Sequence, residues 1–416
     1  MPPFFVGGGT GRAPASLPME GIHVHAAGWS VMAHGFVNVG QRWDPTPRGD
    51  RSPFFTQMLM ASARRTLGAG WLDANLQLSI ESLGGRRGYP LLLQTGETAD
   101  GVVPLVDRQH PHDALGGASL TYTLEIEEGA WAFLYGALAG SPALGPVPYM
   151  HRPSGSINPV APLSHHFLDA THIAYGVITG GVANDLIQAE ASWFNGREPD
   201  QERWLPERPA LNSWSARLTI TPGGSWAAQA SFANLDEPEQ LHPAVDVYRS
   251  TVSLMHHAEW ERGAWSTTLA WGQNQRQRTT MTLAEARARL PAPLLAHYLG
   301  LAPLPPGADD TLLLLIDKRV RSGTLAETAL RWGRITTFAR YEGLLKDELF
   351  APPDPRHSTA YRLTKIEAGA AYEAGRRGRL TLRVGGSASA HRLPVELTPL
   401  YGARPVGYTL YTRLAF

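Results

Sequence analysis

Residues 72–81 read Leu-Asp-Ala-Asn-Leu-Gln-Leu-Ser-Ile-Glu, and every second residue of this stretch is polar. Because side chains point to alternate faces along a β-strand, such a segment has one wet face and one apolar face. The same period recurs in residues 213–220 and 249–260. The pattern repeats in so many segments of about ten residues that closure around a polar lumen explains it more simply than a soluble sandwich.

The alternation covers nearly the whole chain and predicts about sixteen strands, with fourteen or eighteen as the alternatives. The expected strands are 28–40, 55–66, 70–82, 117–127, 129–140, 170–180, 185–195, 212–221, 224–234, 247–261, 263–275, 324–333, 335–344, 363–374, 378–391 and 406–416. Short connections such as 67–70 and 262–263 follow the even-numbered strands, whereas most of the longer ones follow the odd-numbered strands. This asymmetry predicts an all-β fold, a transmembrane antiparallel β-barrel with tight turns at one end and long loops at the other.

We expect a single barrel domain over residues 28–416, preceded by a flexible N-terminal arm at 1–27. The long outer loops are expected at 83–116, 141–169 and 276–323. The last of these loops contains helix formers on either side of a proline pair, and this composition predicts a short helical insertion at residues 282–300.

Composition narrows the class of protein further. The 416 residues contain 37 Lys and Arg, 37 Asp and Glu, and no cysteine, so neither a nucleic-acid partner nor a disulfide-stapled module is favoured. The longest aliphatic stretch, 312–316, is too short for a membrane-spanning helix. The N-terminus shows no signal peptide, so export is not visible in the sequence itself.

The C-terminus supports the outer membrane of bacteria as the compartment. Tyr408, Leu410 and Leu414 share one strand face with Phe416, the last residue. This pattern is similar to the final strand that the outer-membrane assembly machinery recognises. We therefore expect membrane lipid and this machinery as partners of the chain.

Several motifs follow one another in the first half of the chain. They are Leu93–Thr98 (LQTGET), Asp107–Asp113 (DRQHPHD), Pro142–Pro146 (PALGP), Met150–Ser154 (MHRPS), His165–His166, Asp169–His172 and Phe194–Asp200 (FNGREPD). In this order they resemble a family of uncharacterised bacterial outer-membrane β-barrel proteins. The resemblance covers about 28–416 and implies the barrel and its compartment, but no activity. The helical insertion at 282–300 is atypical of this family.

Histidines are concentrated in the same part of the chain, with six of the 15 between residues 110 and 172. Imidazole and carboxylate groups together suit transition metals such as copper or zinc. The candidate metal ligands, expected to meet at the outer mouth, are His110, His112, Asp113, His165, His166, Asp169 and His172. Two other roles stay open, namely hydrogen bonding that holds the loops in place and a catalytic site.

A second, weaker metal candidate lies on the lumen face of the first two strands. It consists of Met32, His34, Met58 and Met60, a combination that favours copper, although methionine also serves as adaptable lumen filling. The sequence contains no Gly-x-Ser-x-Gly motif and no P-loop lysine, so an enzyme is not favoured. The sequence therefore predicts a porin-like or transport-associated barrel with a folded, histidine-rich outer mouth. The alternative is a metal-binding or enzymatic barrel.

Overall fold

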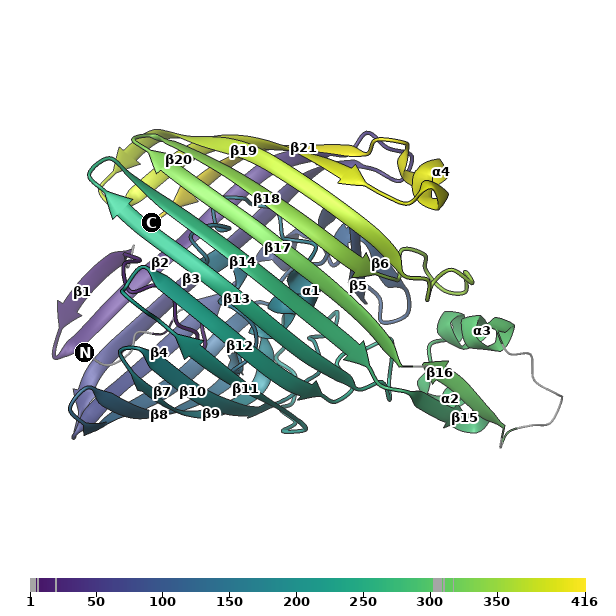
Figure 1. Ribbon diagram of the computed structural model, residues 1–416, viewed down its shortest axis with the longest axis horizontal. Coiled ribbons are helices and arrows are strands. Elements are labelled where there is room, and N and C mark those ends of the chain that lie inside the picture. The colour runs from purple at the N-terminus through teal and green to yellow at the C-terminus, as the bar shows by residue number, and fades with distance from the viewer. Residues whose placement is uncertain (1–4, 6, 19–20, 302–308, 310, 317) are drawn as a thin grey trace.

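The computed structural model describes residues 5, 7–18, 21–301, 309, 311–316 and 318–416. Sixteen antiparallel strands close into one barrel, and each pairs with the next barrel strand along the chain (Figure 1). The first and last of them, β2 (Trp29–Trp43) and β21 (Val406–Ala415), pair with each other and so close the cylinder.

The other barrel strands follow in chain order around the wall. They are β3 (Arg51–Leu67), β4 (Gly70–Leu78), β7 (Leu115–Glu127), β8 (Ala130–Gly140), β9 (Ala174–Asn184), β10 (Ile187–Phe194), β11 (Ser213–Ile220), β12 (Trp226–Leu235), β13 (Val247–Trp260), β14 (Gly263–Arg276), β17 (Arg319–Trp332), β18 (Ile335–Lys346), β19 (Tyr361–Arg377) and β20 (Leu380–Arg392). Every predicted strand overlaps one of these sixteen, so the predicted fold and strand number are confirmed.

The two faces of the wall differ as the alternation predicts. Leu218 on β11 faces outward with 46% of its surface exposed, whereas Arg217 and Thr219 on either side face the lumen with 6% and 2% exposed. Tight turns join the strands at one end, where Gly129 has a φ of 77° that favours glycine. Among the described residues, no helix is long and apolar enough to cross a membrane.

Two of the long loops fold into the barrel instead of standing above it. Residues 79–114, the first inner loop, contain η1 (Glu81–Gly84) and the hairpin of β5 (Tyr89–Thr98) and β6 (Pro104–Gln109). Residues 141–173, the second inner loop, contain three short helices, η2 (Tyr149–His151), α1 (His165–Leu168) and η3 (Ala170–His172). Their apolar side chains form a core inside the cylinder, including Leu91, Leu92, Leu93, Val160 and Leu163.

The N-terminal arm, expected to be flexible over 1–27, is packed inside the lumen over residues 7–18. Thr10 is fully buried and hydrogen-bonds Glu190, and the Arg12 guanidinium donates to the carbonyl oxygen of Asn184 over 2.8 Å. Gly9 forms a β-bridge with Ser141 of the second inner loop, where a Cβ atom would clash. The glycine run is therefore needed for close packing. After the arm, β1 (Ile22–Ala26) pairs antiparallel with the first residues of β2, from Ala26 with Trp29 to Ile22 with Ala33.

The predicted helical insertion is present at the far end of the molecule, where α2 (Leu283–Arg289) and α3 (Ala292–Leu301) follow each other (Figure 1). The Thr282 side chain accepts a hydrogen bond from the Glu285 amide, and the Glu285 carboxylate accepts one from the Thr282 amide, which fixes the start of α2. The small strands β15 (Thr279–Thr282) and β16 (Leu312–Ile316) lie at its base. A last short helical segment, η4 (Val395–Leu397) with α4 (Thr398–Tyr401), precedes β21.

Candidate functional site

A layer of buried ion pairs ties the second inner loop to the barrel wall. The Arg152 side chain is fully buried, and its guanidinium lies 2.7 Å from both Glu327 on β17 and Asp169 in its own loop. Arg340 on β18 contacts the other carboxylate oxygen of Glu327 at 3.2 Å. Because one arginine bridges loop and wall in a dry interior, this loop is held firmly in the lumen.

The five histidines predicted to converge do lie together; we call His110, His112, His165, His166 and His172 the histidine cluster. The ring centroids of His112 and His172 are 5.3 Å apart, and those of His165 and His172 are 5.1 Å apart. The rings of His110 and His166 are 6.1 Å apart. The two inner loops therefore meet through these rings.

Four of the five histidines of the cluster have a partner from their own loop at Nδ1. The Nδ1 atoms of His112 and His165 lie 2.7 Å from carboxylate oxygens of Glu81 and Asp169, respectively. His172 donates from Nδ1 to the carbonyl oxygen of Asp169 over 2.8 Å. These bonds orient the rings and leave the Nε2 atoms of His112 and His172 buried without a hydrogen-bond partner.

The two predicted carboxylate ligands are committed to other cations. Asp113 accepts hydrogen bonds from Arg203 over 3.0 Å and from the Tyr175 hydroxyl over 2.7 Å. Arg203 also contacts Glu97, whose other carboxylate oxygen lies 2.9 Å from Nε2 of His110. Asp169 is shared between Arg152 and His165. Asp113 therefore connects to the cluster through Arg203 and Glu97.

Burial controls the charge of the cluster. It lowers the pKa of His166 and His172 well below the ordinary value, so both imidazoles are neutral at physiological pH. Burial also acts to lower the pKa of His112, but the Glu81 carboxylate outweighs it and the pKa is raised. Burial raises the pKa of Asp113 to about 6, although Arg203 opposes this shift.

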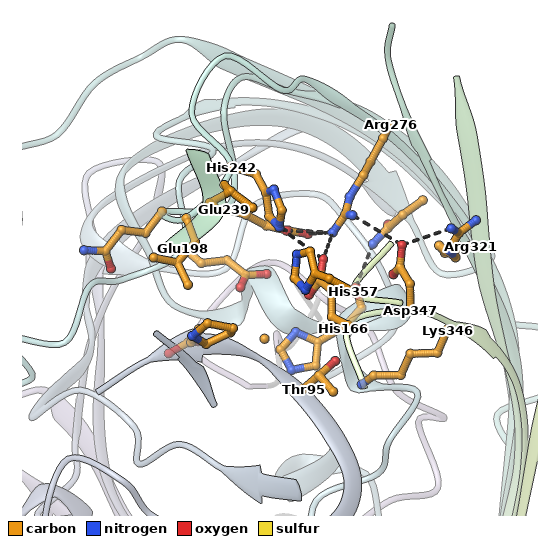
Figure 2. A pocket seen from close by; sticks show the side chains of 18 of the residues that line it. Thr95, His166, Glu198, Glu239, His242, Arg276, Arg321, Lys346, Asp347 and His357 are labelled. Atoms are coloured by element: carbon orange, nitrogen blue, oxygen red, sulfur yellow. Dashed lines mark hydrogen bonds and ion pairs between the residues drawn. The ribbon is translucent and has the colours of Figure 1, made fainter. Parts of the chain in front are cut away.

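A second polar site lies at the long-loop end, in a pocket of about 70 Å³ that we call the outer pocket (Figure 2). Its lining includes His242 from loop 236–246 and Glu348 and His357 from loop 347–360. Arg276 lies among them and contacts Glu348 at 2.5 Å and Glu239 at 2.7 Å. Sequence reasoning missed this site because its residues lie far apart in the chain and share no spacing signal.

The weaker metal candidate lines a larger space at the tight-turn end, an inner cavity of about 710 Å³. Met32, His34, Met58 and Met60 all line it, and His34 pairs directly with Met60 across β2 and β3. The ring of His34 lies 5.9 Å from that of His151 in the second inner loop. The predicted group is therefore assembled on one wall of a cavity that the N-terminal arm also lines.

Comparison with solved structures gives the type of barrel. The chain is similar to the anion-selective porin from Comamonas acidovorans (TM-score 0.52, 11% identity, covering 93% of this chain and 100% of the porin). It is also similar to Salmonella typhi OmpF in complex with daunomycin (TM-score 0.52, 10% identity, covering 95% of this chain and 100% of OmpF). The fold is that of the outer-membrane porins. No protein-family profile and no curated sequence matches the chain.

Within this porin fold, three ligand-type atoms come close together at one place among the described residues. One ligand atom from each of His242, Glu348 and His357 lies within 4.8 Å of the other two. Among the described residues, the histidine cluster that the sequence predicts has no three such ligand atoms all within 4.8 Å of one another.

Proposed function

We propose that the chain is a transport-associated, porin-like barrel of the bacterial outer membrane whose lumen the two inner loops close. The membrane assignment is supported by the outward-facing apolar side chains, among them Leu76, Leu134, Ile366 and Leu410, which are 43–61% exposed. A belt of this kind in contact with water would be costly, whereas lipid accommodates it.

The observation that carries the closed lumen is the dry layer within the barrel. Leu91, Leu92, Leu93 and Leu163 on the inner loops are at most 1% exposed. Among the described residues, the inner cavity and the outer pocket share no lining residue. A sixteen-stranded barrel is otherwise wide enough for an aqueous channel. Passage of a solute thus requires the inner loops to move.

Conductance across a planar lipid bilayer tests this proposal. The wild-type protein is expected to insert but to conduct little. Arg152→Ala removes the guanidinium that joins Asp169 to Glu327 and leaves these buried carboxylates only their second partners, His165 and Arg340. Breaking a buried ion pair in this way costs up to about 3–5 kcal/mol. The second inner loop should then loosen, and conductance should rise.

Arg64→Ala is the matched control, because Arg64 also faces the lumen and pairs with Asp73 at 2.6 Å, but both residues are on barrel strands. This variant should conduct as the wild type does. A large, steady conductance of the wild-type protein would contradict the closed lumen, and failure to insert into lipid would contradict the membrane assignment.

The histidine cluster has a structural role in this proposal, that of joining the two inner loops. The support is that rings from the two loops pack together, with the centroids of His112 and His172 5.3 Å apart. His112 and His165 also use their Nδ1 atoms for hydrogen bonds within their own loops. Metal binding by the cluster is the alternative. Metal analysis of the purified protein with and without His172→Ala separates the two, because a structural cluster predicts unchanged metal content.

A further inference from the structure

Three buried side chains from two outer loops face one another in the outer pocket. His242, Glu348 and His357, the outer triad, are 6%, 7% and 2% exposed, and their ligand atoms lie within 4.8 Å of one another. Figure 2 shows His242 and His357 near each other beside Arg276. The amide of Glu348 donates to the carbonyl oxygen of His357 over 2.9 Å, so the backbone itself holds these two residues side by side.

The hydrogen bonds of His357 prepare it to bind a cation. Its Nδ1 atom donates to the carbonyl oxygen of Phe350 over 2.8 Å. This bond places the proton on Nδ1 and leaves a lone pair on Nε2, which is buried without a hydrogen-bond partner. Histidine ligands of metal ions commonly use one ring nitrogen for the ion and the other for such a carbonyl.

The surrounding charges favour a cation. Glu239, Asp347 and Glu348 provide three carboxylates, whereas Arg276 and Arg321 provide the two guanidinium groups that contact them. Glu97, Glu198 and Lys346 also line the pocket, and the Lys346 ammonium donates to Gln94 over 3.1 Å. Acidic side chains therefore outnumber basic ones in the lining of the outer pocket, five to three.

We propose that the outer triad binds one divalent transition-metal ion, of the zinc or copper class, through two imidazole nitrogens and one carboxylate oxygen. Nitrogen and carboxylate oxygen ligands lie about 2.0–2.1 Å from zinc, which puts neighbouring ligands of a tetrahedral ion about 3.4 Å apart. The ligand atoms of the triad, which lie within 4.8 Å of one another, would therefore come closer together by about 1 Å when the ion binds. The fourth ligand would be water or His297 of α3. The ring of His297 lies 5.2 Å from that of His357.

Such an ion would link loop 236–246 to loop 347–360 and so brace the outer mouth. This inference goes beyond the proposed function and does not depend on it, because a conducting barrel could carry the same site. Its ligands also differ from those of the histidine cluster. The two sites can therefore be tested separately.

The test uses the full-length protein, folded in detergent, stripped with a chelator and titrated with Zn²⁺ by calorimetry. One ion should bind per chain, and His242→Ala, Glu348→Gln and His357→Ala should each weaken binding by about tenfold or more. The controls are His172→Ala in the histidine cluster and His391→Ala on β20, which should bind as the wild type does. A mobility shift on boiling in SDS confirms that each variant is folded.

Co²⁺ gives a second measure on the unaltered protein, because its visible absorption reports coordination by nitrogen and oxygen ligands and should disappear when Zn²⁺ is added. The proposal is overturned if the folded wild-type protein binds no Zn²⁺. It is also overturned if the triad variants bind as the wild type does, or if only His172→Ala loses the ion.

Discussion

Single residues on the barrel wall differ in tolerance according to the face on which they lie. Leu76 and Asn75 are neighbours on β4, but Leu76 faces outward and is 43% exposed, whereas Asn75 lines the inner cavity. A charge at the first position meets lipid, and a charge at the second meets other polar groups and water. The pair thus offers a direct test of which face is in the membrane.

Leu76→Lys is expected to destabilise the folded barrel by about 2–4 kcal/mol, and Asn75→Lys by less than about 1 kcal/mol. Unfolding by denaturant in lipid vesicles measures both differences. Equal losses at the two positions would show that the assignment of the lipid and lumen faces is wrong. Gln77, the other neighbour of Leu76 along β4, is a poorer control than Asn75, because it is 6% exposed and packed against Gly116.

At the scale of elements, the second inner loop should respond to acid. Burial lowers the pKa values of His165, His166 and His172 below the ordinary value of 6.5, so the unfolded loop binds protons more readily than the folded loop. Their contribution to loop stability is complete above pH 6.5 and is lost as the pH falls below it. The pKa of His112 is shifted in the opposite direction, upward, but His112 lies in the first inner loop.

We expect conductance to rise when the pH is lowered from about 7.5 to about 5, because the second inner loop loosens. The double variant His166→Gln, His172→Gln removes two of the three groups and should show a smaller rise over the same range. Bilayer recordings of both proteins at the two pH values measure the difference. An identical pH response of variant and wild type would mean that these histidines do not control the loop.

The elements also differ in how far the sequence predicts them. Barrel strands such as β11 alternate polar and apolar residues because lipid and lumen act on each strand separately, so each can be recognised alone. The hairpin of β5 and β6 escaped prediction because Leu91, Leu92 and Leu93 are all buried in the loop core, and an unbroken apolar run carries no period. Packing between distant loops decides its position.

The two candidate sites also differ in how far the sequence predicts them. The convergence of His112 with His172 could be predicted because their loops leave neighbouring parts of the wall and His172 has lumen phase. The outer triad could not, because His242 and His357 are separated by four barrel strands and come together only through the path of their loops. Nor could the packing of residues 7–18, since a glycine run reads as flexible unless its contact with Ser141 is known.

At the scale of the whole molecule, the closed cylinder predicts resistance to detergent. Every barrel strand has a hydrogen-bonded neighbour on both sides, so the closed sheet has no unpaired edge at which SDS could begin to unfold it. The protein should therefore migrate differently on SDS gels before and after boiling. Equal mobility, together with solubility in the absence of detergent, would contradict a membrane barrel.

The pairing of β2 with β21 also has a consequence for biosynthesis. The two strands stand at opposite ends of the chain, and β21 bonds β20 on its other side from Thr381 with Ala415 to Ala390 with Val406. A nascent chain interrupted before residue 406 would present β2 and β20 as two open edges, which invite pairing with other chains. Only a chain translated through its final strand can pair both edges. Truncated chains would therefore expose unpaired strand edges to the quality-control factors of the periplasm.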